Sequence, residues 1–251
     1  MNKVVFGLFA HPDDAEFMCA GTLALLAQRG WQIHIATMTA GDCGSKELNS
    51  KQISDIRKAE AAESAKILGG SYHCLECEDI FVMYDKPTLL KAIKLMRQIQ
   101  PAVVFTASPV DYMVDHTTAS KIAMTACFSS GIPNIETKGA ESFEPVPFLY
   151  YVDAVRGRDI FGNEIKPQMI VDISGVIQTK EKMLKCHESQ RTWLLKHHGV
   201  DEYVEFMKRF SRLRGEAISS SFGEGFRQHL GEAYPEENIL KAELGELVHI
   251  I

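Results

Sequence analysis

The segment FAHPDDAE, residues 9–16, joins an apolar run at residues 4–9 to a largely apolar helical run at residues 17–28. A strand-like run followed at once by a helix is typical of the first strand-to-helix corner of an α/β fold. Ligands in such folds bind at the carboxyl ends of the strands. This corner therefore places one histidine and two aspartates where binding sites are usually built.

The side chains of this corner suit a divalent metal ion. His11 and Asp14 lie three residues apart at the turn, and an imidazole nitrogen with a carboxylate oxygen suits zinc. Asp13, between them, could instead hold a water molecule. The alternative is a plain helix N-cap, with Pro12 near the first turn and an aspartate as the cap. Capping does not explain a histidine directly before Pro-Asp-Asp.

Length and composition limit the class of protein. The 251 residues are 45% hydrophobic and 24% charged, which suffices for a single α/β domain over residues 1–251. The net charge of -6 argues against a general nucleic-acid binder. Six scattered cysteines are typical of free thiols in a reducing compartment. No apolar run approaches the roughly 20 residues of a membrane helix, and the first run suits a buried strand better than a signal peptide, so we expect a cytoplasmic protein.

Strand-like and helical segments alternate along most of the chain. We expect strands at residues 4–9, 31–38, 72–75, 102–106, 148–152 and 169–173, and helices at residues 17–28, 50–68, 88–98, 117–128 and 174–196. The C-terminal third is expected to be mainly helical, with Phe206, Phe210 and Leu213 as its packing stripe. This alternation predicts a mostly parallel sheet with helices on both faces.

A second strand-to-helix corner, SPVDYMVDH at residues 108–116, follows the fourth expected strand. Parallel strands end at the same edge of a sheet, so this corner should open beside His11 and Asp14. His116 is then the best-placed third ligand, and three protein ligands leave a fourth position for water, as in catalytic zinc sites. The alternative is a helix start at which Asp115 is the cap.

His187 has two possible roles. It shares one face of the helix expected at residues 174–196 with Val176, Lys180 and Met183. A histidine on a half-apolar face is usually a buried core residue. The alternative is that His187 lines a pocket.

Five motifs together resemble the LmbE-like family of zinc-dependent N-acetylglucosaminyl deacetylases, which includes the PIG-L enzymes and the deacetylases of mycothiol and bacillithiol synthesis. The match extends over nearly the whole chain, and its first motif is the most specific. The motifs are AHPDDAE at residues 10–16, Arg57 and Glu60 with Ile67-Leu68-Gly69, Asp115-His116, His187-Glu188-Ser189-Gln190, and Gly223-Glu224-Gly225-Phe226.

The resemblance implies a fold, a reaction and a set of site residues. The implied fold is a Rossmann-like three-layer α/β sandwich. The implied reaction is hydrolysis of an N-acetyl group on an N-acetylglucosamine-type sugar or conjugate, releasing acetate. One Zn²⁺ per chain would be bound by His11, Asp14 and His116, with Asp13 as general base. Members of this family often form trimers or hexamers, so a homo-oligomer is possible.

Met113 departs from the family pattern. The family usually has a histidine three residues before the metal-binding histidine, where it helps to stabilise the tetrahedral intermediate. Methionine has no hydrogen bond to donate, and a missing oxyanion donor can cost about 10²–10³ in rate. Either Tyr112 or His187 substitutes for it, or the substrate differs, or activity is weak.

Arg57 is a candidate for substrate binding, because a guanidinium can hold sugar hydroxyls or an anionic group. The alternative is a surface ion pair with Glu60 or Glu63.

Three other classes of function compete with the deacetylase. One is a zinc hydrolase of another amide or ester, and another is a metal-binding homologue that has lost turnover through Met113. The third is a nucleotide-binding Rossmann protein, which the absence of a G-x-G-x-x-G or Walker A pattern disfavours.

Overall fold

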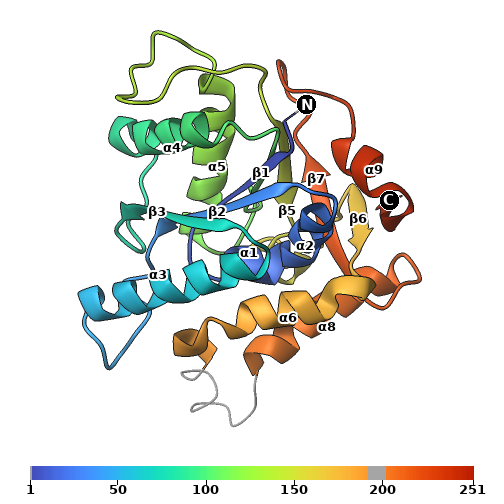
Figure 1. The fold of residues 1–251 in the computed structure, drawn as a ribbon. Coiled ribbons are helices and arrows are strands. Elements are labelled where there is room, and N and C mark those ends of the chain that lie inside the picture. Colours follow the sequence, from blue (N-terminus) through green and yellow to red (C-terminus); the bar gives the residue numbers. More distant parts are fainter. Residues whose placement is uncertain (1, 192–201) are drawn as a thin grey trace.

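Residues 2–191 and 202–251 are described by a computed structural model, in which an eight-stranded sheet lies between two layers of helices (Figure 1). The strands are β1 Val4–Phe9, β2 Gln32–Thr39, β3 Ser71–Cys77, β4 Val103–Thr106, β5 Phe148–Val152, β6 Met169–Asp172, β7 Gly223–Gln228 and β8 Val248–Ile250. The helices are α1 Asp14–Met18, α2 Ala20–Gln28, α3 Ser50–Ile67, α4 Lys86–Ile99, α5 Val114–Ser129, α6 Ile177–Lys185, α8 Glu202–Glu216 and α9 Ile239–Leu244, with short 3-10 turns η1 Val155–Gly157, η2 Ser174–Val176 and η3 Gly245–Leu247. Within these described ranges, none of the helices combines the length and apolar character needed to cross a bilayer.

The sheet has the order β3-β2-β1-β4-β5-β7-β6-β8. The first five of these strands pair in parallel, and β7, β6 and β8 extend the sheet by antiparallel pairing. The predicted α/β fold with a mostly parallel sheet is confirmed. β1 is covered on both faces, which explains why its sequence is apolar throughout instead of alternating.

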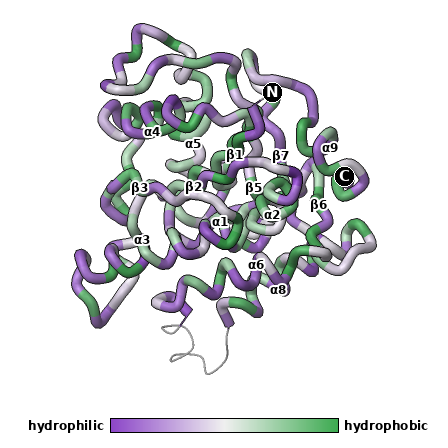
Figure 2. Tube along the Cα trace, viewed as in Figure 1, coloured by the Kyte–Doolittle hydropathy of each residue, from purple (hydrophilic) through white to green (hydrophobic). Residues whose placement is uncertain are grey.

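Each face of the sheet packs against its own group of helices. On one face α4 and α5 cover Phe6 and Leu8 of β1, and Ile93 and Met96 point from α4 into this core. On the other face α1, α2, α3 and α6 form the second helical layer (Figure 1). Hydrophobic and hydrophilic residues alternate along α4 in Figure 2, as expected for a helix that packs on one side only.

One prediction about the C-terminal half is wrong, and a second is incomplete. The expected helix at residues 174–196 begins as a 3-10 turn and α6 ends at Lys185, so His187 lies beyond it; residues 192–196 are outside the described ranges. The expected helical C-terminal third contains α8 but also β7 and β8. The sequence of β7, GEGFRQ, has two glycines and weak alternation, and it is strand because β5 and β6 pair with it on both sides.

Glu224 of β7 connects this strand to α2 and α6. Its carboxylate accepts hydrogen bonds from the backbone amides of Gly21 (2.9 Å) and Thr22 (2.7 Å) in the first turn of α2. It also pairs with the Lys180 ammonium at 2.7 Å, and both side chains are buried. Glu224 therefore satisfies amides at the helix start that have no partner within the helix, and it neutralises a buried cation.

Replacing Glu224 with glutamine should destabilise the protein by about 3–5 kcal/mol, because Lys180 would keep its buried charge without a counter-ion. Urea denaturation measures the change in free energy of unfolding. The matched control is Asp55→Asn, which removes an exposed ion pair with Lys51 and should change stability little. A Glu224→Gln variant as stable as the control would show that this contact does not hold the fold together.

Candidate metal centre

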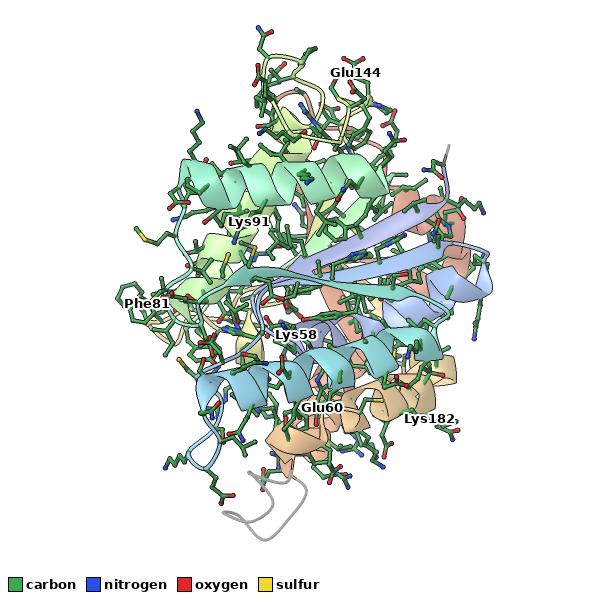
Figure 3. The ribbon with its side chains drawn as sticks, turned by 60° about the vertical axis from the view of Figure 1, so that its left-hand side comes forward. Lys58, Glu60, Phe81, Lys91, Glu144 and Lys182 are labelled. Carbon is green, nitrogen blue, oxygen red and sulfur yellow. The ribbon has the colours of Figure 1, made fainter. Side chains whose placement is uncertain are left out.

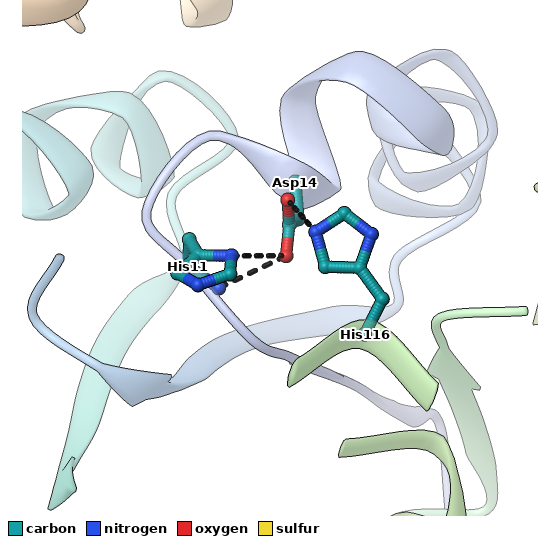
Figure 4. Close-up of side chains that lie close together, drawn as sticks. All are labelled: His11, Asp14 and His116. Carbon is teal, nitrogen blue, oxygen red and sulfur yellow. Dashed lines mark hydrogen bonds and ion pairs between the residues drawn. The ribbon is translucent and has the colours of Figure 1, made fainter. Parts of the chain in front are cut away.

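The two strand-to-helix corners meet at one edge of the sheet (Figure 4). β1 and β4 are parallel neighbours, with Leu8 opposite Thr106, so the segments that follow them emerge side by side. His116 Nε2 lies 3.4 Å from Asp14 Oδ1, and the two imidazole rings are 5.4 Å apart between centroids. One ligand atom from each of His11, Asp14 and His116 falls within 4.8 Å of the other two. The predicted convergence of these three side chains is confirmed.

The backbone of the first corner is fixed by Asp14 itself. Its Oδ2 atom accepts hydrogen bonds from the backbone amides of Ala10 (3.1 Å) and His11 (2.9 Å), which leaves Oδ1 facing His116. Asp13 precedes α1 with a φ of 105°, and its side chain makes no capping hydrogen bond. The alternative of a plain N-cap is therefore wrong. A left-handed non-glycine residue at such a corner is typical of functional sites.

In each candidate histidine ligand, a carboxylate contacts one ring nitrogen: Nδ1 of His116 and Nε2 of His11. His116 Nδ1 lies 3.0 Å from Asp111 Oδ1, and His11 Nε2 lies 3.0 Å from Asp79 Oδ1 and 3.3 Å from Asp115 Oδ2. A carboxylate on the outer nitrogen of a metal-binding histidine fixes the ring and its tautomer. Asp115 is thus a partner of His11, and the idea that it caps α5 is wrong because Met113 is the N-cap residue.

Asp79 and Asp111 were not predicted as site residues. Asp111 lies in the second corner, SPVDYMVDH, five residues before His116. This short spacing in the sequence could have identified Asp111 as a partner of His116. Asp79 follows β3, at the same sheet edge, but no motif in the sequence distinguishes it. His11, Asp79 and Asp115 also form a second group that could hold a metal ion, and it shares His11 with the first.

These carboxylates control the protonation of both histidines. Burial lowers the pKa of His11, but hydrogen bonds to Asp115, Asp14 and Asp79 outweigh burial and raise that pKa to about 12. Burial likewise lowers the pKa of His116, and the charges of Asp14 and Asp111 raise it to about 10. Both rings are therefore protonated at neutral pH in the protein alone. Two imidazoles and one carboxylate around an acidic cavity are a donor set that fits a divalent metal ion.

Binding of a divalent metal ion should release about two protons at pH 7, because the rings of His11 and His116 must be neutral to act as ligands. Both pKa values are raised, so metal affinity should rise with pH up to about 12, and most steeply below about pH 10, where both rings must lose a proton. Calorimetric titration of zinc in buffers with different ionisation enthalpies counts the protons. Release of none at pH 7 would contradict this electrostatic picture.

Asp13 faces the cavity beside the three candidate ligands. Its carboxylate accepts a hydrogen bond from the Tyr203 hydroxyl of α8, and Asp13 Oδ1 lies 3.6 Å from Arg57 Nη2. Burial raises the pKa of Asp13 above its ordinary value, although Arg57 opposes this. Tyr203 was not predicted, because nothing in its helical pattern distinguishes it from a packing residue.

Arg57 is built into the wall of the site. Its guanidinium donates hydrogen bonds to the backbone carbonyls of Pro12 (2.7 Å) and Gly41 (3.3 Å), and the residue is only 5% exposed. The alternative of a surface ion pair is wrong. Glu60, on the α3 face seen in Figure 3, instead accepts two hydrogen bonds of 2.7 Å from Ser189.

The candidate metal centre opens into a cavity of about 1210 Å³. His11, Asp13, Asp14 and His116 line it together with residues of α8 and of the segment after β5. Tyr112 and Met113 also line this cavity, and their contact with a substrate stays a prediction. The Tyr112 ring meets the His116 ring edge-on at 5.7 Å and is 66% exposed.

His187 does not line this cavity. Its side chain is fully buried, with Nε2 3.4 Å from Glu16 Oε1, and Ser64 donates to the same Glu16 oxygen at 2.6 Å. The prediction that His187 contacts substrate is wrong for this reason. The interpretation as a buried histidine describes its position. Burial lowers the pKa of His187, but the charge of Glu16 and its hydrogen bond outweigh burial and leave this pKa raised.

Comparisons with known proteins show what this chain is similar to. The model of the family described as PIG-L, GlcNAc-PI de-N-acetylase, matches residues 7–127, which include both corners. A diacetylchitobiose deacetylase of Thermococcus kodakarensis is 26% identical over 240 residues, 90% of this chain and 82% of that protein. A 4-oxalmesaconate hydratase of Pseudomonas putida is 26% identical over 197 residues, 75% of this chain and 74% of that protein. The solved structure of N,N'-diacetylchitobiose deacetylase from Pyrococcus horikoshii has a TM-score of 0.78 at 25% identity, covering 94% of this chain and 88% of that chain.

Proposed function

The chain belongs to the PIG-L (LmbE-like) family, and from this premise we propose that it is a zinc-dependent hydrolase that removes the N-acetyl group from an N-acetylglucosamine-type sugar or conjugate. The observation that carries the proposal is the meeting of His11, Asp14 and His116 beside Asp13 at an open cavity. We propose that one zinc ion per chain is held by these three side chains. The substrate is then a small amino sugar bound in the cavity.

Zinc in this position would polarise the acetamide carbonyl and lower the pKa of a water molecule. Asp13 takes a proton from the attacking water as the new carbon–oxygen bond forms. Asp13 then gives that proton to the sugar nitrogen as the carbon–nitrogen bond breaks, which yields acetate and a free amine. A raised pKa suits a carboxylate that acts first as base and then as acid. Arg57 and Tyr203 hold Asp13 in place.

The carbonyl oxygen needs a hydrogen-bond donor that Met113 does not provide. Of the two substitutes considered, His187 is buried away from the cavity, whereas Tyr112 lines it next to His116. Burial and the nearby carboxylates raise the pKa of Tyr112, so its hydroxyl keeps its proton. We therefore assign Tyr112 as the donor to the developing oxyanion. Arg57, which lines the same cavity, is assigned to the sugar hydroxyls.

A second candidate function is addition of water to a carbon–carbon double bond of an unsaturated acid. The similarity to a 4-oxalmesaconate hydratase favours it, as does Met113 in place of an oxyanion donor. A metal site with an adjacent base would serve either reaction.

Acetate release from a panel of N-acetylglucosamine conjugates tests the proposal. The zinc-loaded protein should hydrolyse at least one conjugate, and N-propionyl and ester analogues test whether another acyl group is preferred. Unsaturated dicarboxylic acids in the same panel report hydration through loss of ultraviolet absorbance. Hydration without any acetate release would replace the deacetylase by the second candidate.

A further inference from the structure

We propose that His34 and His73 form a second metal site, which binds a divalent transition-metal ion of the zinc and copper class and joins the edge strand β3 to β2. Neither histidine belongs to the candidate metal centre, so this inference does not depend on the proposed function. His34 Nδ1 lies 3.1 Å from His73 Nε2. The two rings are stacked, with centroids 5.4 Å apart and an angle of 20° between their planes.

Strand pairing places both histidines on the same face of the sheet. β2 and β3 are parallel neighbours, and β3 is the edge strand (Figure 1). His34 is in register with Phe6 and His73 with Ala36, and Phe6 and Ala36 both belong to the core on the α4 and α5 side. Each histidine is half-buried. The strands therefore hold the two imidazoles in place while part of each ring stays open to solvent.

The separation of the two nitrogens suits a shared metal ion. Zinc binds imidazole nitrogens at about 2.0–2.1 Å, so two such bonds place their nitrogens about 2.9 Å apart at a right angle and about 3.3 Å apart at the tetrahedral angle. The observed 3.1 Å lies between these values. The same distance allows one N–H···N hydrogen bond, in which one ring keeps its proton. A metal ion would take the place of that proton and bind both nitrogens.

The charge state of the pair also suits a transition-metal ion. Burial lowers the pKa of His34, and burial together with the charge of His34 lowers the pKa of His73. Both rings are therefore neutral at pH 7, whereas His11 and His116 must first lose protons. Among the described residues, each ring has only the other as its hydrogen-bond partner, and no carboxylate shifts either pKa. Two nitrogen donors without oxygen ligands favour zinc or copper over magnesium and calcium.

A metal ion at this pair would cross-link the edge of the sheet. β3 has a neighbouring strand on one side only, and Asp79, which contacts His11, follows β3 in the chain. An ion held by one side chain from each strand binds the paired strands and not the unfolded chain, so it stabilises the folded protein. The unfolding temperature should therefore continue to rise with zinc concentration after the candidate metal centre is filled.

Calorimetric titration of zinc at pH 7 tests the inference on the full chain. The wild type should show a tighter event at the candidate metal centre, which releases about two protons, and a weaker event at the pair, which releases almost none. A weak chelator should remove the weaker ion first, because only two side chains hold it. Magnesium at the same concentration should not compete with zinc for the weaker event.

The double variant His34→Gln/His73→Gln should lose the weaker event and keep the tighter one. Equilibrium dialysis against free zinc should then find one ion fewer per chain than in the wild type. Each single variant, His34→Gln or His73→Gln, should also lose the weaker event, because one imidazole cannot chelate the ion. The tighter event, where it is retained, shows that the variant is folded.

The matched control is His249→Gln. His249 is also half-buried and on an edge strand, β8, but in the part of the chain that the structure describes no second imidazole stacks on it. This variant should keep both events. A double variant that binds as many zinc ions as the wild type would overturn the inference and leave the contact as a hydrogen bond. Loss of the tighter event alone from the wild type would count against the proposed function and not against this site.

Discussion

Replacing Asp13 with alanine should abolish acetate release while the purified protein keeps its zinc. Several carboxylates line the cavity next to the three candidate ligands. Asp14 is itself a candidate ligand, and Asp79 and Asp111 contact the imidazole rings. Among the described residues, Asp13 is the one that remains. General acid–base catalysis contributes about 10²–10⁴ in rate, so a loss of at least that size is expected. Acetate release and metal content are measured on the same preparation.

Asp13→Asn sharpens this test, because asparagine keeps the shape of the side chain and tolerates the left-handed backbone at this position. It should be as inactive as Asp13→Ala, although a hydrogen bond to Tyr203 remains available. Asp55→Asn, an exposed change on α3, is the control and should be fully active. Turnover close to that of the wild type in both Asp13 variants would remove this carboxylate from the reaction.

Replacing His116 with alanine should remove the metal and the activity together. The variant loses one of three ligands and leaves the buried Asp111 carboxylate without its histidine partner. Loss of an outer partner of a metal ligand costs about 10–100-fold in metal affinity, and loss of a ligand itself should exceed this. Elemental analysis after dialysis against a weak chelator should fall from about one zinc per chain to almost none.

His249→Ala is the control for this prediction, because His249 lies on the edge strand β8, away from the cavity. It should keep both metal and turnover. A His116→Ala protein that retained a full equivalent of zinc after the same dialysis would show that the metal binds elsewhere. The group of His11, Asp79 and Asp115 would then be the first alternative.

The part of the site on the parallel strands could be predicted from the sequence. The apolar runs that became β1 and β4 are unambiguous, and parallel strands end at the same edge, so His11, Asp14 and His116 had to emerge near one another. The helix expected at residues 88–98 is present as part of α4. Ile93 and Met96 lie three residues apart, at helical spacing, and both are buried in the core.

Other features depend on contacts that no local pattern encodes. Tyr203 reaches Asp13 from a helix 190 residues later in the chain, and its position follows from how α8 packs. β7 is a strand only because β5 and β6 lie on either side of it. The helix expected through His187 ends at Lys185, where His187 instead turns inward to Glu16. Strand pairing and packing decided the cases of β7 and His187 against the local sequence preference, and the packing of α8 decided where Tyr203 points.

The central claim is that one metal ion is held by His11, Asp14 and His116, and a crystal structure of the zinc-loaded protein tests it most directly. Anomalous scattering recorded above and below the zinc absorption edge locates the ion without reference to any assumed ligand. The account predicts one zinc peak at about 2.0–2.2 Å from a nitrogen of each histidine and an oxygen of Asp14. A peak bound by Asp79 and Asp115 and out of reach of His116, or no peak at this corner, would contradict it.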